Sequence, residues 1–393
     1  METLTTQSLT ISPTEIFEWA LQRGYATALW RLPNSKIIHC LIDFSEKIEP
    51  QPLQIDEFSE KKGFLFSPFE NEGLQKNFFL NADFYSNSTQ ILMPESIPFL
   101  KDFDNKRAKI SNLAPTQVQL ALPNTDFEKV QHLHLVEKAV RAIKEKAFQK
   151  VVLSRKMRVA FSEILQISRV FQNLCTLYPL AFVSVVYVPS CNIWIGASPE
   201  ILVSVDKNNI FRTMALAGTQ KYPEGANLSE ITWTQKEIEE QALVSRYIIN
   251  AFKKIRLREF EEDGPKTIQA GNLAHLRTDF WVNLNEVHYP HLWQVMLGLL
   301  HPTSAVCGMP KEESLAFIRN FEGYDRAFYS GFLGQVNIES ETHIFVNLRC
   351  MQVLPSLQEA YLYAGGGITA NSNPEKEWNE TALKMETMLK AII

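Results

Sequence analysis

The sequence predicts an α+β protein in which sheets pack face to face and helices cover them on the outside. Strand-like runs follow one another at hairpin spacing between residues 150 and 218. This spacing favours an antiparallel sheet over a parallel strand–helix–strand arrangement. A second set of strand-like runs lies between 332 and 368, and long helical patterns stand before, between and after the two sets. Such segregation of strands and helices is typical of α+β folds.

The length and composition indicate a large folded protein. The chain has 393 residues, of which 45% are hydrophobic and 21% charged, and these values exclude a disordered chain. Surface scaling predicts that about three quarters of the extended chain's surface is buried on folding. The net charge is −5, and the densest basic stretch, 144–158, is interrupted by apolar residues. Neither feature supports nucleic-acid binding.

The sequence shows no signal for secretion, membrane insertion or disulfide bonding. The first fifteen residues lack the basic and apolar regions of a signal peptide, and no stretch approaches 18 uninterrupted apolar residues. Five scattered cysteines form no Cys-x-x-Cys pair and no readable zinc site: Cys40, Cys175, Cys191, Cys307 and Cys350. We therefore expect a soluble cytoplasmic protein without a disulfide framework.

The N-terminal third reads as a mixed α/β opening. Ser12-Pro13-Thr14-Glu15 is a helix start signal, and the helix it opens stops at Gly24. Short strand-like runs follow at 26–32, 37–43 and 63–69. Residues 100–126 are polar and contain two prolines, so they are the predicted linker.

The pattern is clearer from residue 127 onward. Residues 127–148 show helical apolar spacing at Val130, Leu133, Val136, Val140 and Ile143. Strands are predicted at 150–161, 181–189, 192–206, 210–218, 332–338, 342–354 and 359–368, and helices at 234–253 and 312–320. A final helix over 374–392 is predicted to bury a stripe made of Trp378, Ala382, Met385, Leu389 and Ile392.

Two of these helices carry paired glutamates. Glu237 and Glu240 lie three residues apart on 234–253, as do Glu377 and Glu380 on the final helix, so each pair shares a helix face. Such pairs form either a solvated acidic face or a site for Mg²⁺, which prefers oxygen ligands. The spacing alone leaves both open.

Lys150 and Glu200 form a second constellation. Each has a plain structural interpretation, since Lys150 follows a helix and Glu200 follows a proline. The alternative is a base and an acid that face one pocket. The glycine-containing segments 217–219 and 364–367 are turns or anion-binding backbone. Neither matches a dinucleotide fingerprint or a P-loop.

Nine segments, in order and spacing, resemble the chorismate-utilising enzymes, which include isochorismate synthases, salicylate synthases, anthranilate synthase component I and aminodeoxychorismate synthase component I. The segments are KVVLSR (150–155), GASPEIL (196–202), LAGT (216–219), HLRT (275–278), LHPTSAVCGMP (300–310), FYSGFLG (328–334), FVNLRC (345–350), YAGGGI (363–368) and PEKEWNETALK (374–384). The resemblance implies one large αββα sandwich of two stacked, mainly antiparallel sheets. Residues 1–120 would be its variable N-terminal part and 121–393 its chorismate-binding catalytic region.

The resemblance implies a Mg²⁺ site. Glu240 and Glu380 fall on the family's metal-binding glutamates. Glu237 and Glu377 match the accompanying acidic positions, which would act through metal-bound water. The residue after the first of these glutamates is commonly His in the family and is Gln241 here. The metal would bridge to the ring carboxylate of chorismate.

The resemblance also implies a substrate pocket. Tyr329 and Arg349 resemble the pair that clamps the enolpyruvyl carboxylate, a contact to which an arginine fork is suited. The backbone expected to hold carboxylates is that of Gly218, Thr219, Gly366 and Gly367, and further pocket positions are His275, Thr303 and Lys384.

Lys150 and Glu200 indicate which reaction the resemblance implies. Ammonia-using anthranilate synthases carry Gln at the position of Lys150, whereas in water-using members a Lys activates water for attack at C2 of the ring. Glu200 matches the general acid that protonates the departing C4 hydroxyl. Aminodeoxychorismate synthases have a nucleophilic Lys where this chain has Ala217. The implied reaction is the Mg²⁺-dependent, reversible conversion of chorismate to isochorismate by an isomerase.

Several alternatives stay open at this point. A salicylate synthase shares the catalytic pair and then eliminates pyruvate, although Ala305 and Val306 favour isochorismate synthases. Lys150 disfavours anthranilate synthase, and the presence of both catalytic residues disfavours an inactive chorismate-binding protein. We expect a monomer that needs no membrane, nucleic acid or glutaminase subunit. The sequence does not choose among menaquinone, siderophore and salicylate pathways.

Overall fold

The computed structural model of the chain describes residues 12–53, 60–88, 91–92, 119–222, 227–270 and 273–393. Most of the predicted linker 100–126 lies outside these residues. Its described end contains the short strand β7 (Leu120–Ala121) and the first residue of helix α3 (Asp126–Lys144).

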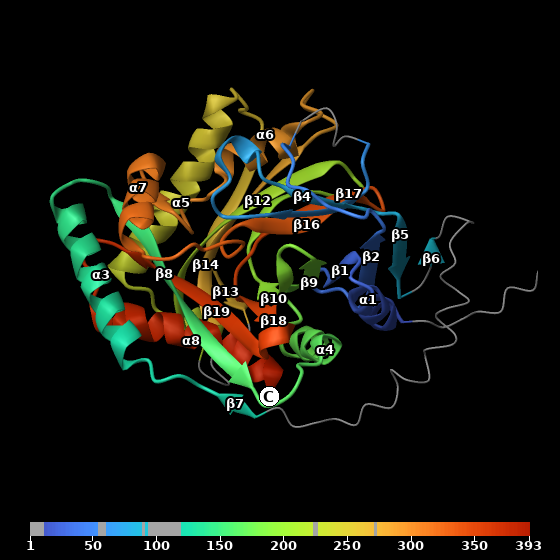
Figure 1. Cartoon of the computed structure of the whole chain (residues 1–393). Helices are drawn as coiled ribbons and strands as arrows, with labels where there is room; N and C mark the ends of the chain where they lie inside the picture. Colours follow the sequence, from blue (N-terminus) through green and yellow to red (C-terminus); the bar gives the residue numbers. More distant parts are fainter. Residues whose placement is uncertain (1–11, 54–59, 89–90, 93–118, 223–226, 271–272) are drawn as a thin grey trace, which may run out of the picture.

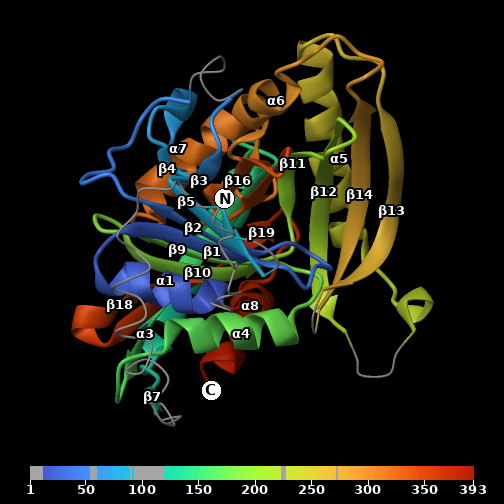
Figure 2. The same cartoon turned by 90° about the vertical axis from the view of Figure 1, so that its right-hand side faces the viewer.

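Within the described residues the strands form two sheets in which every pair is antiparallel (Figures 1 and 2). The eleven-stranded sheet contains β1 (Ala26–Arg31), β2 (Ile38–Asp43), β5 (Phe84–Asn87), β6 (Ile91–Leu92), β7, β8 (Lys150–Phe161), β9 (Phe182–Val188), β10 (Asn192–Ser198), β15 (Gly308–Met309), β18 (Cys350–Leu354) and β19 (Glu359–Ile368). The eight-stranded sheet contains β3 (Gly63–Ser67), β4 (Phe78–Asn81), β11 (Ile201–Val205), β12 (Ile210–Lys221), β13 (Glu261–Ala270), β14 (Leu273–Asn283), β16 (Phe332–Ile338) and β17 (Glu341–Val346).

Helices cover the outer faces of both sheets. The eleven-stranded sheet is covered by α1 (Pro13–Gln22), α4 (Ile167–Leu177) and α8 (Pro374–Ile392), with α3 packed on α8. The eight-stranded sheet is covered by α5 (Gln235–Lys254) and α6 (Leu292–Leu300), and α7 (Lys311–Phe321) packs on β8 and β15. Short 3-10 turns occur at Glu72–Leu74, Leu228–Glu230 and Pro355–Leu357. The predicted αββα sandwich is confirmed, and no helix of the described part is long and apolar enough to cross a membrane.

Aromatic side chains fill the space between the two sheets. Phe182 of the larger sheet stacks on Phe345 of the smaller one, with ring centroids 4.1 Å apart. Phe66 stacks on Phe328 at 3.9 Å, and Trp194 meets Phe328 edge to face at 5.6 Å. These rings bury large apolar areas in preferred geometries, so they hold the sheets in fixed register.

Two of the places where the chain passes from one sheet to the other pair with each other. Residues 199–200 connect β10 to β11, and residues 347–349 connect β17 to β18. The N–H of Ala197 donates to the carbonyl of Arg349 at 3.0 Å, and the N–H of Val346 donates to the carbonyl of Glu200 at 3.0 Å. We call these segments the paired crossovers.

The crossovers correct two sequence predictions. The runs 192–206 and 342–354 were each predicted as one strand, but each is two strands in different sheets. Pro199 has no N–H to donate, which breaks the first run. Arg349 has a φ of +47°, which turns the second run out of its strand. Both runs are apolar on either side of the break, so hydropathy alone does not reveal it.

Other elements depart from the sequence prediction for local reasons. The sequence analysis missed α6, which is apolar on all sides, and β13, where Gly264-Pro265 interrupts the register with β14. It also missed α4 and β14. On α3, the predicted core residue Val130 is 52% exposed. The helix packs mainly against α8 and buries His132 instead.

The predicted stripe of the final helix needs one correction. Ala382 is exposed, while its neighbour Thr381 is fully buried. The Thr381 hydroxyl donates to the carbonyl of Trp378 at 2.7 Å and accepts from Nε of Arg155 at 2.7 Å. Because both hydrogen-bonding roles are satisfied, a polar residue is tolerated on the buried face.

Replacing Gly331 by alanine tests the packing that supports the crossovers. A Cβ there would lie 2.0 Å from the carbonyl oxygen of Ser67, whereas a Cβ at Gly298 would meet nothing closer than 3.6 Å. We expect Gly331→Ala to lower the free energy of unfolding by about 1–3 kcal/mol in urea denaturation, since overpacking displaces backbone. Gly298→Ala, in a helix, is the matched control and should not lose stability. Equal stability of the two variants would contradict this account.

Candidate functional site

The paired crossovers open onto a buried pocket of about 80 Å³. It is lined by residues from both sheets and both helical layers: Val152, Pro199, Glu200, Leu216, Ala217, Gly218, Thr219, Glu240, His275, Ala305, Val306, Tyr329, Leu348, Arg349, Tyr363, Ala364, Gly365, Gly367, Glu380 and Lys384. The volume holds two or three water molecules.

Glu200 lies on the first crossover and is 4% exposed. Burial raises the pKa of its carboxyl to about 8, although the positive charges of Lys150, Lys384 and Arg349 act in the opposite direction. Glu200 is therefore mainly protonated at neutral pH. A protonated carboxyl group that faces a pocket can donate a proton to a departing group.

Arg349 lies on the second crossover in a left-handed backbone conformation. Among the described residues its guanidinium has no hydrogen-bond or ion-pair partner, and burial lowers its pKa. Tyr329 lines the same pocket, and its hydroxyl would lie 2.9 Å from a Cβ placed on Gly365. A free guanidinium with a nearby hydroxyl is suited to receive a carboxylate in two parallel hydrogen bonds.

Gly218 and Thr219 form a bulge in β12. The pairing of β12 with β14 shifts register between Ala217 and Gln220, and Gly218 has a φ of +67°. Nδ1 of His275 donates to the carbonyl of Gly218 at 2.8 Å. Burial lowers the pKa of His275 to about 3, so the ring is neutral and its Nε2 is an acceptor, buried without a partner.

Three lysines pair with three glutamates next to this pocket. Nζ of the fully buried Lys150 lies 2.9 Å from Oε1 of Glu240, at ion-pair distance but without hydrogen-bond alignment. On α8, Glu380 accepts from Lys384 at 2.7 Å. The third pair joins two helices, since Lys236 of α5 donates to Glu377 of α8 at 2.6 Å.

The three glutamates surround two glycines at the end of β19. A Cβ on Gly367 would lie 2.3 Å from Oε1 of Glu240, and one on Gly366 would lie 3.2 Å from Oε2 of Glu377 and 3.7 Å from Oε1 of Glu380. A side chain at Gly367 would collide with Glu240, and one at Gly366 would crowd Glu377. The glycines therefore allow α5 and α8 to bring acidic groups against the strand.

The pKa shifts of two of these glutamates follow their surroundings. Burial raises the pKa of Glu377, against the positive charge of Lys236. Burial acts in the same direction on Glu240, but the charges of Lys150 and Lys236 together hold its pKa below the ordinary value. Glu240 is thus a carboxylate whose charge is balanced by ammonium groups.

The donor set fits a hard cation in its chemistry. Carboxylate oxygens are what Mg²⁺ prefers, and Oε2 of Glu377 is buried without a hydrogen bond, although the Ser372 hydroxyl lies near enough to stabilise the charge. In the described part of the chain no three acidic, His or Cys side chains are close enough together to hold a metal ion. Each of the three glutamates pairs with a lysine instead.

Three sequence-predicted residues lie at the margin of the pocket. Glu237 caps its own helix, accepting from the N–H and the hydroxyl of Thr234 at 2.6 and 2.8 Å. Thr303 is buried with an unpartnered hydroxyl and precedes the lining residues Ala305 and Val306. Gly366 lies beneath Glu377 and Glu380, as described above. The other predicted positions line the pocket, except Lys150 and Glu377, which contact or adjoin its glutamates.

The sequence analysis missed two residues of this region. Tyr363 lines the pocket and stacks between Trp194 and Tyr329, with ring centroids 5.3 and 5.4 Å away. It lies inside an apolar strand, and no sequence signal separates it from a core residue. Lys236 was also missed, although its spacing of four residues from Glu240 places both on one helix face.

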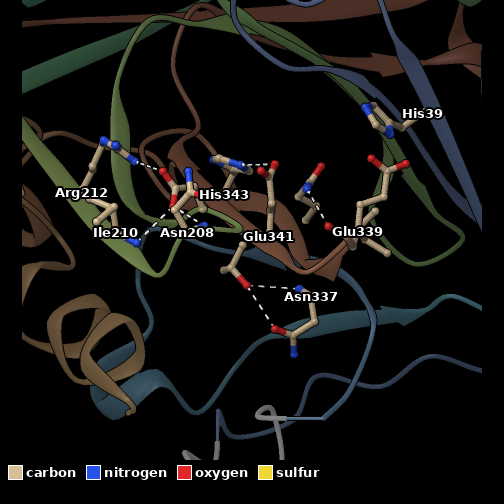
Figure 3. Close-up of polar contacts among 12 residues, drawn as sticks. His39, Asn208, Ile210, Arg212, Asn337, Glu339, Glu341 and His343 are labelled. Carbon is tan, nitrogen blue, oxygen red and sulfur yellow. Dashed lines mark hydrogen bonds and ion pairs between the residues drawn. The ribbon is translucent and has the colours of Figure 1, made fainter. Parts of the chain in front are cut away.

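A second group of polar side chains lies at the opposite end of β11 and β17 (Figure 3). Asp206 accepts from the N–H groups of Asn208 and Ile210 at 2.9 and 3.1 Å, which closes the turn between β11 and β12. Glu341 pairs with His343 at 3.1 Å on the neighbouring hairpin. These contacts are local to the two hairpins, so their role is structural.

Comparison with known proteins finds relatives that share one family description. A family model described as "Chorismate binding enzyme" matches residues 38–393. Isochorismate synthase MenF of Bacillus subtilis (strain 168) is 27% identical over 355 residues, which cover 84% of this chain and 74% of that protein. Isochorismate synthase EntC of Escherichia coli (strain K12) is 24% identical over 395 residues, 97% and 95% of the two chains. The solved structure of MenF, the menaquinone-specific isochorismate synthase of Escherichia coli, has the same fold, with a TM-score of 0.74 and 21% identity over 99% of this chain and 92% of that one.

The pKa of Glu200 predicts how stability depends on pH. It is about 8 in the folded protein and 4.5 as the ordinary value, so the folded state binds one more proton in this window and stability falls as pH rises through it. We expect the unfolding free energy of the unaltered protein to fall relative to Glu200→Gln by about 1.4 kcal/mol per pH unit there. Urea unfolding at several pH values measures this.

The exposed Glu313 of α7 supplies the control. Glu313→Gln should keep the pH profile of the unaltered protein. Parallel profiles for Glu200→Gln and the unaltered protein would show that Glu200 is ionised in the fold.

Proposed function

The chain belongs to the chorismate-binding enzyme family, and we propose that it is an isochorismate synthase, an isomerase that converts chorismate reversibly to isochorismate. One observation carries the proposal: a buried, protonated Glu200 lines the small pocket, and a buried Lys150 contacts Glu240, another residue of its lining. The names of the relatives support the same reaction.

In the proposed reaction, a water molecule adds to C2 of the ring while the C4 hydroxyl departs. Lys150 takes a proton from the attacking water, and Glu200 gives its proton to the leaving hydroxyl, which departs as water. One water enters and one leaves, so the product is an isomer of the substrate. Lys150 must first give up its proton, so its contact with Glu240 has to loosen when substrate binds.

The remaining pocket residues would hold the two carboxylates of chorismate. Arg349 and Tyr329 would receive the enolpyruvyl carboxylate, which gives the free guanidinium its missing partner. The backbone of Gly218, Thr219, Gly366 and Gly367 would face the ring carboxylate, with Lys384, His275 and Thr303 as neighbours.

We further propose Mg²⁺ as the cofactor, held by Glu240 and Glu380, with Glu237 and Glu377 acting through bound water. The ion would neutralise the ring carboxylate and draw electron density from the conjugated system. The protein's own residues then orient the ring and exclude water from the reacting carbons. We propose a cytoplasmic monomer that works without a glutaminase subunit.

The alternatives differ in their products. A salicylate synthase would use the same Lys150 and Glu200 and then eliminate pyruvate. Anthranilate synthase is disfavoured because Lys150 stands where ammonia-using members carry Gln. An inactive binding protein is disfavoured because both proposed catalytic residues are present. The downstream pathway stays open.

Product analysis by NMR or chromatography tests the proposal. Purified protein with chorismate and Mg²⁺ should give isochorismate in balance with chorismate and no pyruvate, and EDTA should stop the reaction. Lys150→Met should lower turnover by about 10²-fold or more, because the general base is lost. Lys156→Met, an exposed lysine on the same strand, is the matched control and should keep full turnover.

Two outcomes would contradict the assignment. Salicylate with pyruvate would move it to the salicylate synthases. A Lys150→Met variant as active as Lys156→Met would remove the proposed base.

A further inference from the structure

Lys236 interacts with three of the glutamates that the proposed function assigns to a metal ion, Glu240, Glu377 and Glu380, which we call the acidic cluster. It lies on the first turn of α5, four residues before Glu240, and its ammonium donates to Oε1 of Glu377 on α8 at 2.6 Å. Its charge also acts on Glu240 and Glu380. The side chain is 24% exposed and its partner Glu377 only 2%. One ammonium therefore neutralises carboxylates from two helices.

The pair with Glu377 matters because that buried carboxylate has little other support, which comes from the nearby Ser372 hydroxyl. Within the described part of the chain, its buried Oε2 receives no hydrogen bond of ordinary geometry. Removing the partner of a buried charge is costly, because the charge then has neither water nor a counter-ion. The other two glutamates have their own partners, Lys150 and Lys384, each of which also has a proposed role toward substrate. Lys236 does not line the pocket, so its position is explained by the glutamates alone.

We propose that Lys236 is an internal counter-cation that occupies the acidic cluster in the metal-free protein and competes with the divalent ion for it. The inference rests on the proposed function, which supplies the ion. When no metal is bound, the contact of Lys236 with Glu377 links α5 to α8. A divalent ion that binds there must displace the ammonium from Glu377. The side chain is partly exposed, so the ammonium can move toward solvent without crossing the core.

The competition predicts an affinity that rises when the charge of Lys236 is removed. Lys236→Gln keeps a hydrogen-bond donor for Glu377 but carries no charge. We expect it to bind Mn²⁺ about tenfold more tightly than the unaltered protein, because a positive charge a few ångströms from the ion is gone. Lys236→Arg keeps the charge and should not bind more tightly. Mn²⁺ binding without chorismate, followed by electron paramagnetic resonance and calorimetry, measures both.

A second readout comes from thermal unfolding. The metal-free Lys236→Gln protein should melt at a lower temperature than the unaltered protein. Mn²⁺ should raise the Tm of the variant by more than it raises the Tm of the unaltered protein. Lys129 of α3 provides the matched control. It pairs with Glu375, which lies on α8 as Glu377 does, at 2.9 Å, and the side chains of this pair are 37% and 56% exposed. Lys129→Gln should change neither the affinity nor the gain in Tm.

Three results would overturn the inference. The first is that Lys236→Gln binds Mn²⁺ no more tightly than the unaltered protein; weaker binding would mean that Lys236 helps the ion to bind. The second is that Lys236→Arg binds Mn²⁺ about tenfold more tightly than the unaltered protein. This second test can still be made if the glutamine variant does not fold. The third is that neither the unaltered protein nor any of the variants binds Mn²⁺. Product analysis of the same samples reports separately on the proposed function, since it needs chorismate and the binding experiment does not.

Discussion

The pairing of two chain crossovers is the constraint on which this structure depends. Each crossover carries a strand out of one sheet and into the other, and backbone hydrogen bonds tie the two together at Ala197–Arg349 and Val346–Glu200. Both crossovers border the pocket, which is lined by Pro199 and Glu200 of the first and by Leu348 and Arg349 of the second. Glu200 and Arg349 occupy these positions, and their unusual states follow from them. One is buried as a neutral acid, and the other is a cation for which the described residues supply no hydrogen-bond or ion-pair partner.

The rest of the site is arranged around a balance of charge. Three carboxylates and three ammonium groups surround the glycine end of β19, and every pair is partly or fully buried. Buried charges are tolerated only when they are paired, so the arrangement is stable without a ligand. Binding of a dianionic substrate and a cation therefore means exchanging partners among charges that are already in place.

Much of this was predictable from the sequence, and the exceptions have physical causes. The sandwich, the final helix over 374–392 and the strand 150–161 follow from periodicity and turn residues. The nine segments that resemble the chorismate-utilising enzymes indicated the pocket residues before any geometry was known. The crossovers were not predictable, because apolar residues continue through both breaks. Lys236 was overlooked because a lysine four residues from a glutamate is ordinary on a helix surface, and only the position of α8 gives it a buried partner.

The protonation state of Glu200 is the most direct test of the account, since it depends on the crossovers, on burial and on the proposed acid role together. Carbon-13 NMR of protein labelled at the glutamate carboxyl carbons, with Glu200→Gln to assign the signal, follows this group alone. The account predicts a carboxyl signal that remains in its protonated form at neutral pH and titrates near pH 8. A signal that has titrated fully below about pH 5, as for an ordinary glutamate, would contradict it.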